Sequence, residues 1–380
     1  MLFRSGHYFL KEGTYTLIGA ETAQALPNSQ VYYAYIRGAG KQYGVPWFGN
    51  ASIFNRWGFK TYGSAGRSEG YDHGPTKGTS LSLMKRLLYS HILYNSVAVG
   101  FENGWFEGDQ LSPIGRIQQS AQRWVKAHGQ PGVMHTPVGL LLDFDSGWSF
   151  PRHLYTANLY RVWGNLPYEA QDHFIDGILN LVYPGYADAS YFRDETGFLT
   201  ATPYGDIVDC LLADAPLWLL ERYPVLIWAG TRQSAELRNK LEAYVRQGGQ
   251  LVSFPEDQRV AGAPAGTPRG EIDRPLVSPF PLTPAAREAL DAVLRAQRLF
   301  EVDPRLALIT CRQGPGRYTL GILNNTWREL PLAIRSWCGE ILELRELPLD
   351  GSEMGAVGYL PESVSRSEER RVGKECRSRW

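Results

Sequence analysis

The chain has 380 residues, of which 39 are basic and 39 are acidic, so its formal net charge is zero. The hydrophobic content of 43% is that of a globular protein and excludes an intrinsically disordered chain. A chain of this length is expected to form two or three domains. There is no run of about 18 apolar residues, so we expect neither a membrane-spanning helix nor a membrane partner.

Both ends of the chain resemble translated sequencing adapter. The matching segments are residues 1–5, MLFRS, and residues 366–380, RSEERRVGKECRSRW. We expect the natural protein to run from Gly6 to about Ser365 and to be cut at both ends, so the two segments stand outside the fold prediction. They hold seven basic and three acidic residues, which leaves a net charge of −4 elsewhere. This balance argues against a nucleic-acid partner; a genuine basic tail is the alternative interpretation of residues 366–380.

The cysteine and aromatic content narrows the class of protein further. Cys210, Cys311 and Cys338 are scattered and show no CxxC spacing, so the sequence indicates neither a disulfide framework nor a metal site, and no cofactor is expected. Aromatic residues make up 12% of the chain, with 11 Trp and 21 Tyr. Flat aromatic faces stack on sugar rings, so this enrichment favours a carbohydrate partner, although aromatics also fill cores. Periplasmic, secreted and cytoplasmic locations all fit the sequence.

Residues 6–130 alternate strand and helix patterns. The expected elements are a strand at 14–21, a helix from 28 or 29 to about 43, a strand at 45–54, a helix at 81–92, a strand at 96–101 and a helix at 116–128. The loop at 55–78 is long enough to be a binding loop or a lid. This alternation predicts a parallel sheet. An open doubly wound sheet also fits, but polar and aromatic groups at three successive strand ends favour the last part of a (β/α)₈ TIM barrel.

The remainder of the chain predicts two further units. Residues 131–257 hold buried-strand and helix patterns typical of a flavodoxin-like or amidotransferase-like α/β domain, with Cys210 expected within an apolar helix. Residues 258–284 are rich in Pro and Gly and predict a linker. A helix from 284 to 298 and three strand patterns then predict a small β-sandwich over 285–365.

The stretch from Ser96 to Phe106 carries the clearest chemical signal. An apolar run ends in Glu102, Asn103 and then Trp105, which is typical of a buried parallel strand that presents polar groups at its carboxyl end. Glu21 follows an apolar run in the same way, two strands earlier. Glycoside hydrolysis uses two carboxyl groups, one protonated and one ionised, so Glu102 and Glu21 are the predicted catalytic pair. The alternative is that each carboxylate pairs with a rim arginine such as Arg37 or Arg56.

The predicted substrate-binding residues are aromatic platforms and hydrogen-bonding groups near the same strand ends. Trp47, Trp57 and Trp105 are the platforms, with a core role as the alternative. Hydrogen-bonding or charged candidates are Asn50, Asn55, Arg56, Asp72, His73, Lys77 and Asn103. Lys77 is not part of a phosphate-binding P-loop, because it precedes the second glycine of GPTKGTS. It lies beside an expected helix start, where an anion such as a sugar carboxylate could bind.

The order of these units resembles family 42 β-galactosidases and related clan A glycoside hydrolases. Residues 83–105 look like the last barrel unit of that family, and residues 223–254 look like its middle domain, which implies a role in oligomer contacts. The resemblance also implies a nucleophilic Glu on the seventh barrel strand and an acid/base on the fourth. Residues 45–54 match that seventh strand and hold no carboxylate, so the resemblance implies the reaction class and not the catalytic pair.

The sequence therefore predicts that the full-length protein is a glycoside hydrolase-like protein that acts on an oligo- or polysaccharide. The fragment given by this chain is expected to be inactive, because more than half of the barrel is absent from it. Two alternatives stay open: a non-catalytic carbohydrate-binding barrel, and a scaffold that forms homo-oligomers through the α/β domain.

Overall fold

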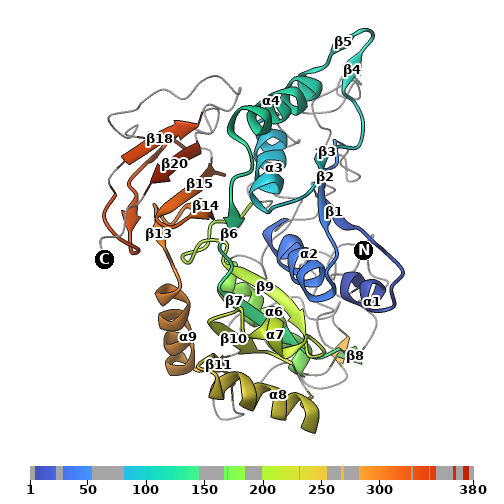
Figure 1. Cartoon of the computed structure of the whole chain (residues 1–380), viewed down its shortest axis with the longest axis vertical. Coiled ribbons are helices and arrows are strands. Elements are labelled where there is room, and N and C mark those ends of the chain that lie inside the picture. Colours follow the sequence, from blue (N-terminus) through green and yellow to red (C-terminus); the bar gives the residue numbers. More distant parts are fainter. Residues whose placement is uncertain are drawn as a thin grey trace.

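The computed structural model is a mixed α/β protein whose described residues form two parallel sheets, a five-stranded antiparallel sheet and four two-stranded antiparallel ladders (Figure 1). The structure describes residues 5–22, 29–53, 81–144, 167–168, 170–184, 199–230, 232–254, 267–268, 282–326, 328–341, 343–347, 363–364 and 371–375. None of the helices in these ranges is long and apolar enough to cross a membrane.

The first unit is a three-stranded parallel sheet in the order β1-β2-β3. Its elements are α1 (Ser5–Lys11), β1 (Ile18–Thr22), α2 (Ser29–Tyr43), β2 (Trp47–Ala51), α3 (Leu81–Leu93), β3 (Val99–Phe101), β4 (Phe106–Glu107), β5 (Gln110–Leu111) and α4 (Pro113–His128). The alternation of strand and helix follows the sequence prediction, and sequential strands pair side by side as in a barrel wall. Closure of such a sheet into a complete barrel remains a proposal.

Helix α2 lies between this sheet and the next unit (Figure 1). Thirteen of its fifteen residues are buried, including Tyr33 and Arg37. A helix that is buried on all sides is part of a core and not of a surface. At Gly38 the helix approaches β9 (Val208–Leu212) so closely that a Cβ atom would lie 1.8 Å from the carbonyl oxygen of Cys210. Helix α2 therefore joins the two units.

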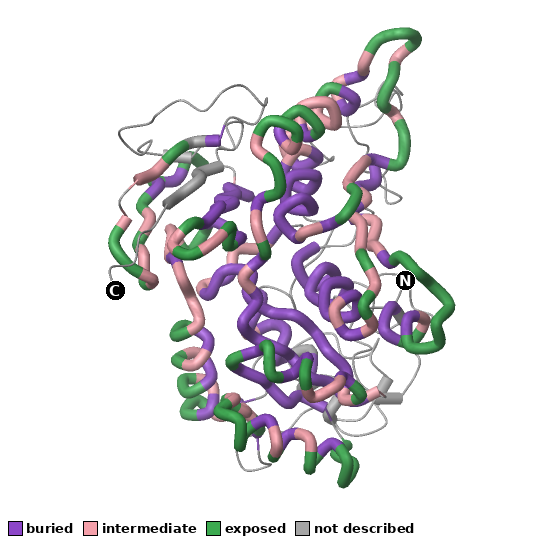
Figure 2. Tube along the Cα trace, viewed as in Figure 1, coloured by how far each residue is buried: buried purple, intermediate pink, exposed green. Residues whose placement is uncertain are grey.

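The second unit is a four-stranded parallel sheet in the order β11-β10-β7-β9. The strands are β7 (Val138–Leu142), β9 (Val208–Leu212), β10 (Val225–Trp228) and β11 (Gln250–Val252), and the helices are α6 (Ala170–Val182), α7 (Leu217–Leu220) and α8 (Ala235–Arg246). In chain order this is 2-1-3-4, as in flavodoxin-like sheets. β7, β9 and β10 are buried along their whole length, whereas α8 turns exposed residues outward (Figure 2).

The expectation that Cys210 lies in an apolar helix is wrong. Cys210 is the middle residue of β9, in register with Leu140 of β7. A short run of apolar residues does not show by periodicity whether it forms a strand or part of a helix. The thiol is fully buried, and burial raises its pKa well above the ordinary value. This sulfur is therefore a core group and not a nucleophile.

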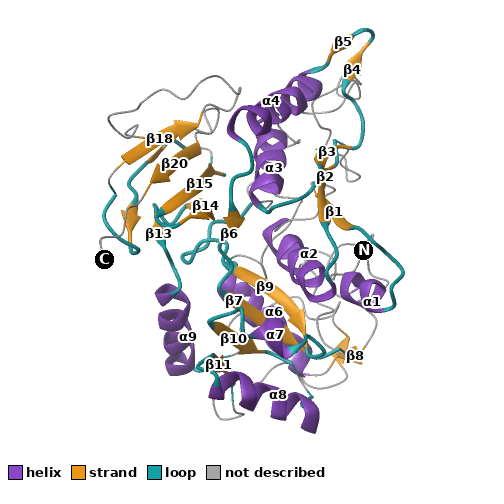
Figure 3. Ribbon diagram, viewed as in Figure 1, coloured by secondary structure: helices purple, strands orange, loops and turns teal. Residues whose placement is uncertain are grey.

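The third unit is a five-stranded antiparallel sheet in the order β18-β20-β15-β14-β6 (Figure 3). Its elements and those beside it are β6 (Val133–Met134), α9 (Pro284–Ala296), β13 (Phe300–Glu301), β14 (Leu306–Gly314), β15 (Arg317–Asn324), β16 (Leu330–Pro331), β17 (Arg335–Ser336), β18 (Glu343–Leu347), β19 (Ser363–Val364) and β20 (Arg371–Glu375). β13 pairs with β17 and β16 pairs with β19 as separate two-stranded ladders.

Two segments are placed differently from the sequence prediction. β6 lies in the range expected for the α/β domain, yet it pairs with β14 of the third unit. β20 lies in residues 366–380, which were set outside the fold, yet it pairs with both β15 and β18. The expected linker at 258–284 falls mostly outside the described residues. Within it, β12 (Thr267–Pro268) pairs with β8 (Pro167–Tyr168).

Candidate functional site

The sheet of β1, β2 and β3 has one face turned toward the helices. On β1, Thr22 Oγ1 lies 3.1 Å from Nε2 of His91 in α3. On β2, a Cβ atom at Gly49 would lie 2.4 Å from the Cβ of His91, so only glycine leaves room for the imidazole. Side chains alternate along a strand. Glu21 and Asn50, the neighbours of these residues, therefore point to the opposite face, which we call the open face.

Glu102 is held at the carboxyl end of this sheet by the strand beside it. Its Oε1 accepts a hydrogen bond from Ser52 Oγ at 2.5 Å and another from the backbone N–H of Ile53 at 3.1 Å. Both donors directly follow β2, so the carboxylate leans from β3 toward the central strand. Glu102 is otherwise exposed. One oxygen is thus fixed by the protein, while the side chain stays accessible to a ligand.

Glu21 and Asn50 are direct neighbours across β1 and β2, and Asn50 is in register with Gly100 of β3. Glu21 and Glu102 thus lie at the same edge of the sheet with one strand between them. Neighbouring strands are ~4.8 Å apart, and Glu102 lies two residues beyond the β3 position in register with Glu21, so the two chain positions are about 12 Å apart. The structure therefore brings together the two carboxylates that the sequence singled out.

Trp105 and Asn103 extend the same edge outward. Trp105 is 44% exposed, and its Nε1–H donates to the carbonyl of Phe101 at 3.0 Å. Asn103 is also exposed. Both residues lie in the turn between β3 and β4. The carboxyl end of β3 therefore presents an aromatic ring and an amide close to Glu102.

Trp47 lies apart from these residues. It starts β2 on the face turned toward the helices, and its Nε1–H donates to the carbonyl of Tyr94 at 2.9 Å. Its ring packs over Gly40 of α2, where a Cβ atom would approach it to 2.5 Å. Of the two roles that the sequence left open for Trp47, the placement favours the core role. Asn55, Arg56, Trp57, Asp72, His73 and Lys77 all lie outside the described residues.

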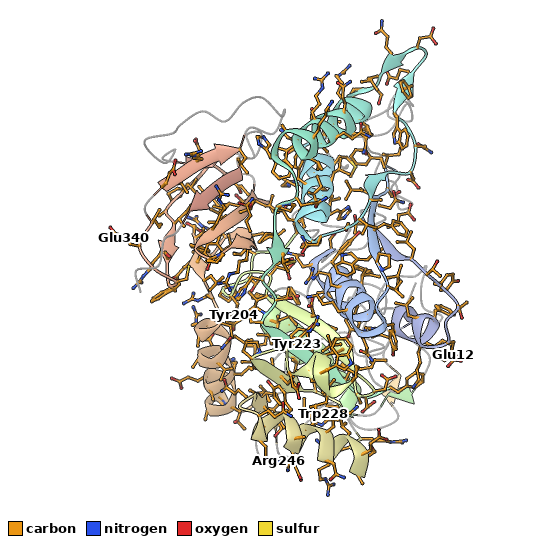
Figure 4. The ribbon with its side chains drawn as sticks, viewed as in Figure 1. Glu12, Tyr204, Tyr223, Trp228, Arg246 and Glu340 are labelled. Atoms are coloured by element: carbon orange, nitrogen blue, oxygen red, sulfur yellow. The ribbon has the colours of Figure 1, made fainter. Side chains whose placement is uncertain are left out.

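Arg37 does not pair with a rim carboxylate, so the rim pairing suggested for it is wrong. Its Nε donates to Asp209 Oδ1 at 2.9 Å, and its Nη2 lies 3.5 Å from Asp206 Oδ1. Asp209 also accepts from Lys41 Nζ at 2.5 Å. All of these groups lie at the junction of α2 and β9, and Arg37, Asp206 and Asp209 are buried. The hydroxyls of Thr136 and Tyr223 donate to Asp209 Oδ2 at 2.8 and 3.1 Å, and Figure 4 labels Tyr223.

The two aspartates of this cluster respond differently to burial. Desolvation raises the pKa of Asp206 above the ordinary value, because Arg37 offsets only part of that cost. Desolvation acts on Asp209 in the same direction, yet Lys41 and Arg37 together hold the pKa of Asp209 below its ordinary value. Asp209 is thus the ionised anchor of what we call the α2–β9 cluster (Arg37, Lys41, Asp206 and Asp209).

A buried chain of rings connects this cluster to the sheet. The Arg37 guanidinium lies 5.0 Å from the ring centre of Tyr94, which stacks on Tyr33 at 4.9 Å. Tyr33 in turn lies 4.7 Å from the His91 ring, and His91 contacts Thr22 beside Glu21. Burial lowers the pKa of His91 to about 3, so this imidazole is neutral at physiological pH. The cluster and the rings therefore support the sheet from behind the open face.

The described residues contain no group of three or more His, Cys, Asp or Glu side chains arranged to hold a metal ion. Asp143, which the sequence shows in a DxD pattern, accepts a hydrogen bond from the backbone N–H of Arg232 at 2.9 Å. Its oxygen thus supports the loop after β10.

Two residues of the site were missed at the sequence level. Ser52 supplies the hydroxyl that holds Glu102, and Phe48 lies on the open face with its ring across Gly19, where a Cβ atom would lie 2.5 Å from it. The alternation of residues 47–51 gives a signal for Phe48, because Asn50 and Phe48 are two residues apart in a strand. Nothing in the sequence identifies Ser52.

Comparisons with known proteins show a likeness in fold. No protein-family model matches the sequence, and a search of curated proteins finds no match. Among solved structures, α-L-fucosidase isoenzyme 2 from Paenibacillus thiaminolyticus superposes with a TM-score of 0.54 at 11% identity, covering 97% of this chain and 66% of the fucosidase. The chain thus spans just under two thirds of that enzyme. At this identity the likeness shows the fold alone.

Two further solved structures are similar at lower scores. An exo-carrageenase GH42 from Bacteroides ovatus has a TM-score of 0.40 at 10% identity, over 78% of this chain and 39% of the enzyme. A rhamnosidase from Novosphingobium sp. PP1Y has a TM-score of 0.45 at 10% identity, over 96% of this chain and 35% of the enzyme.

Proposed function

We propose that this chain forms part of a glycoside hydrolase that acts on an oligo- or polysaccharide. The observation that carries the proposal is the convergence of Glu21 and Glu102 on one edge of a parallel sheet, with exposed Trp105 beside them. Active sites of barrel enzymes are built at that edge. The fold likeness to a fucosidase supports the same reaction class.

In this proposal Glu102 and Glu21 are the two carboxyl groups of glycoside hydrolysis. One protonates the leaving-group oxygen, and the other acts on the opposite side of the scissile bond as a nucleophile or as a base for water. Ser52 and the Ile53 N–H fix Oε1 of Glu102, so its orientation is set before a sugar binds. Asn50, between the two carboxylates in the sheet, is placed to donate its amide to a sugar hydroxyl.

Turnover of a panel of aryl glycosides by the complete protein of which this chain forms part tests the proposal. Replacing Glu102 by Gln, or Glu21 by Gln, keeps the shape of the side chain and removes its proton chemistry. We expect each change to lower kcat by roughly 10²–10⁴-fold, the usual contribution of a general acid or base. Glu12→Gln is the matched control, because Glu12 is exposed beyond α1, away from this edge (Figure 4).

Three outcomes decide the assignment. Turnover that is lost in both site variants and kept in Glu12→Gln supports it. Turnover that survives in both site variants refutes the assignment of these carboxylates. Sugar binding without turnover of any glycoside by the unmodified protein favours the alternative, a carbohydrate-binding barrel.

A further inference from the structure

A small hairpin projects beyond the carboxyl edge of the sheet. Its strands β4 and β5 pair through Phe106 with Leu111 and Glu107 with Gln110, and Gly108 takes a φ of 61° in the turn between them. Figure 1 shows it reaching away from the body of the protein, between β3 and α4. A two-stranded hairpin is marginally stable by itself. The contacts at its base must therefore hold it.

The base of the hairpin is clamped by the start of α4. Ser112 caps that helix, donates its backbone N–H to the carbonyl of Trp105 at 2.9 Å, and donates its hydroxyl to the carbonyl of Gly104 at 2.5 Å. Arg116 donates to the carbonyl of Leu111 at 2.9 Å. A Cβ atom at Gly115 would lie 2.0 Å from the carbonyl oxygen of Trp105, so glycine permits this approach. The hairpin is thus fixed in direction relative to Glu102.

The hairpin holds two exposed aromatic rings at successive positions. Trp105 is 44% exposed and Phe106 is 58% exposed. Exposed Trp218 and Trp337 differ from them, because Arg222 lies 5.0 Å from the Trp218 ring centre and Arg335 lies 4.0 Å from that of Trp337. Among the described residues, no cationic side chain lies over the Trp105 ring. Its indole N–H is already bonded to Phe101, which leaves apolar ring surface for a ligand.

We propose that this hairpin is a second sugar-binding position, in which Phe106 stacks on a pyranose ring of an oligosaccharide whose preceding units lie at Trp105 and Glu102. The proposal rests on the proposed function for the unit at Glu102. Stacking buries the C–H face of a sugar against the rings, which is the contact that aromatic side chains provide. With this second position the protein would bind several units of an oligosaccharide and not only a terminal sugar.

The charge of the hairpin favours a sugar over a membrane surface as its ligand. The turn carries Glu107 and Asp109 beside the rings, with no basic residue between Trp105 and Leu111. Anionic lipid surfaces attract clusters of Lys and Arg and repel carboxylates. Carboxylates are suitable partners for neutral sugar hydroxyls. The composition of the hairpin therefore favours a neutral carbohydrate.

Binding of oligosaccharides of increasing length tests the proposal. Calorimetric titrations of the 380-residue protein would use β-1,4-linked gluco-, galacto- and manno-oligosaccharides of one to six units, with unmodified protein, Phe106→Ala and Trp218→Ala. We expect affinity to rise with length in the unmodified protein and in Trp218→Ala. We expect Phe106→Ala to lose roughly tenfold or more in affinity for the longer sugars, because the ring surface that the sugar covers is removed, and to bind the single sugar unchanged.

The outcomes separate this proposal from the proposed function. If affinity in Phe106→Ala still rises with length as in unmodified protein, the hairpin proposal is overturned, while the Glu102 and Glu21 turnover results stand on their own. An unmodified protein that binds no sugar of the panel also overturns it. So does sedimentation with phosphatidylcholine vesicles that disappears in Phe106→Ala. Thermal unfolding of each variant shows that the fold is kept, and Gly115→Ala, which displaces the hairpin base, is expected to reproduce the loss.

Discussion

The carboxylates of Asp209 and Glu102 both accept hydrogen bonds from hydroxyl groups, but their surroundings are opposite. Asp209 is fully buried at the α2–β9 cluster and is surrounded by Arg37, Lys41 and two hydroxyls. Glu102 is exposed at the open edge, and the described residues hold it through Oε1, which accepts from Ser52 and a backbone N–H. A carboxylate whose oxygens are fully engaged fixes structure, while one that is oriented but accessible is available for chemistry.

The same contrast applies to aromatic residues. Tyr33 and Tyr94 are stacked behind the sheet with no exposed surface, whereas Trp105 and Phe106 are ordered and exposed. The buried side joins two units of the fold, and the open side presents groups to a ligand. The comparison predicts that substitutions on the two sides affect different measurements.

The largest effect is expected from Arg37→Met. Breaking a buried ion pair by removing one partner leaves the other charge unpaired and costs about 3–5 kcal/mol. Here the change leaves Asp206 without its cation and Asp209 with Lys41 alone. Urea unfolding of the variant measures the loss. A loss below about 1 kcal/mol would show that the cluster is not the anchor between α2 and β9.

Gly38→Ala tests the close contact of helix and strand without changing a charge. The added methyl would lie 1.8 Å from the Cys210 carbonyl oxygen, so α2 must move away from β9. Overpacking of this kind costs about 3 kcal/mol at the upper end of its usual range. Gly314→Ala is the matched control, because nothing lies within 4 Å of its Cβ position. Equal unfolding free energies for the two variants would contradict the contact.

The buried histidines predict a pH dependence of folding. Burial lowers the pKa of His91 to about 3 and that of His7 to about 4, against about 6.5 in the unfolded chain. Both are neutral in the folded state, so their contribution is complete above pH 6.5 and is lost as the pH falls. Between pH 6.5 and pH 5 each should remove about 2 kcal/mol from the unfolding free energy.

Unfolding of His91→Gln across the same pH range isolates one of these contributions. We expect the loss of unfolding free energy between pH 6.5 and pH 5 to shrink by about 2 kcal/mol, the His91 share, while His7 and His135, whose pKa values burial also lowers, still titrate. An unchanged loss would mean that His91 is not the neutral group packed beneath Gly49.

The smallest effect on stability is expected at the open edge. Glu102 is exposed, and glutamine can still accept from Ser52 and Ile53, so Glu102→Gln should change the unfolding free energy by no more than about 0.5 kcal/mol. A loss comparable to that of Arg37→Met would place Glu102 among the structural groups and would remove the distinction between the two regions.

Local patterns in the sequence predicted many of the strands and helices. They could not predict which side chains pair over long distances in the sequence. The apolar run before Glu102 and the turn residues around it identified the strand end. Arg37 was assigned to the rim because its partners lie 169 and 172 residues away, beyond any local pattern. Cys210 was assigned to a helix because short apolar runs are ambiguous. The hairpin was missed although Gly108 signals its turn.

The most direct test of a sugar site at the open edge follows the indole N–H signals of the tryptophans by NMR. The ligand titrated into the protein is a sugar that the binding or turnover experiments identify. We expect the Trp105 signal to shift in a saturable manner, while the signals of buried Trp124 and of Trp218 on α7 stay in place. We also expect the Trp105 shift to weaken in Glu102→Gln. A saturable shift at Trp218 with none at Trp105 would contradict the assignment of the sugar site to the open edge.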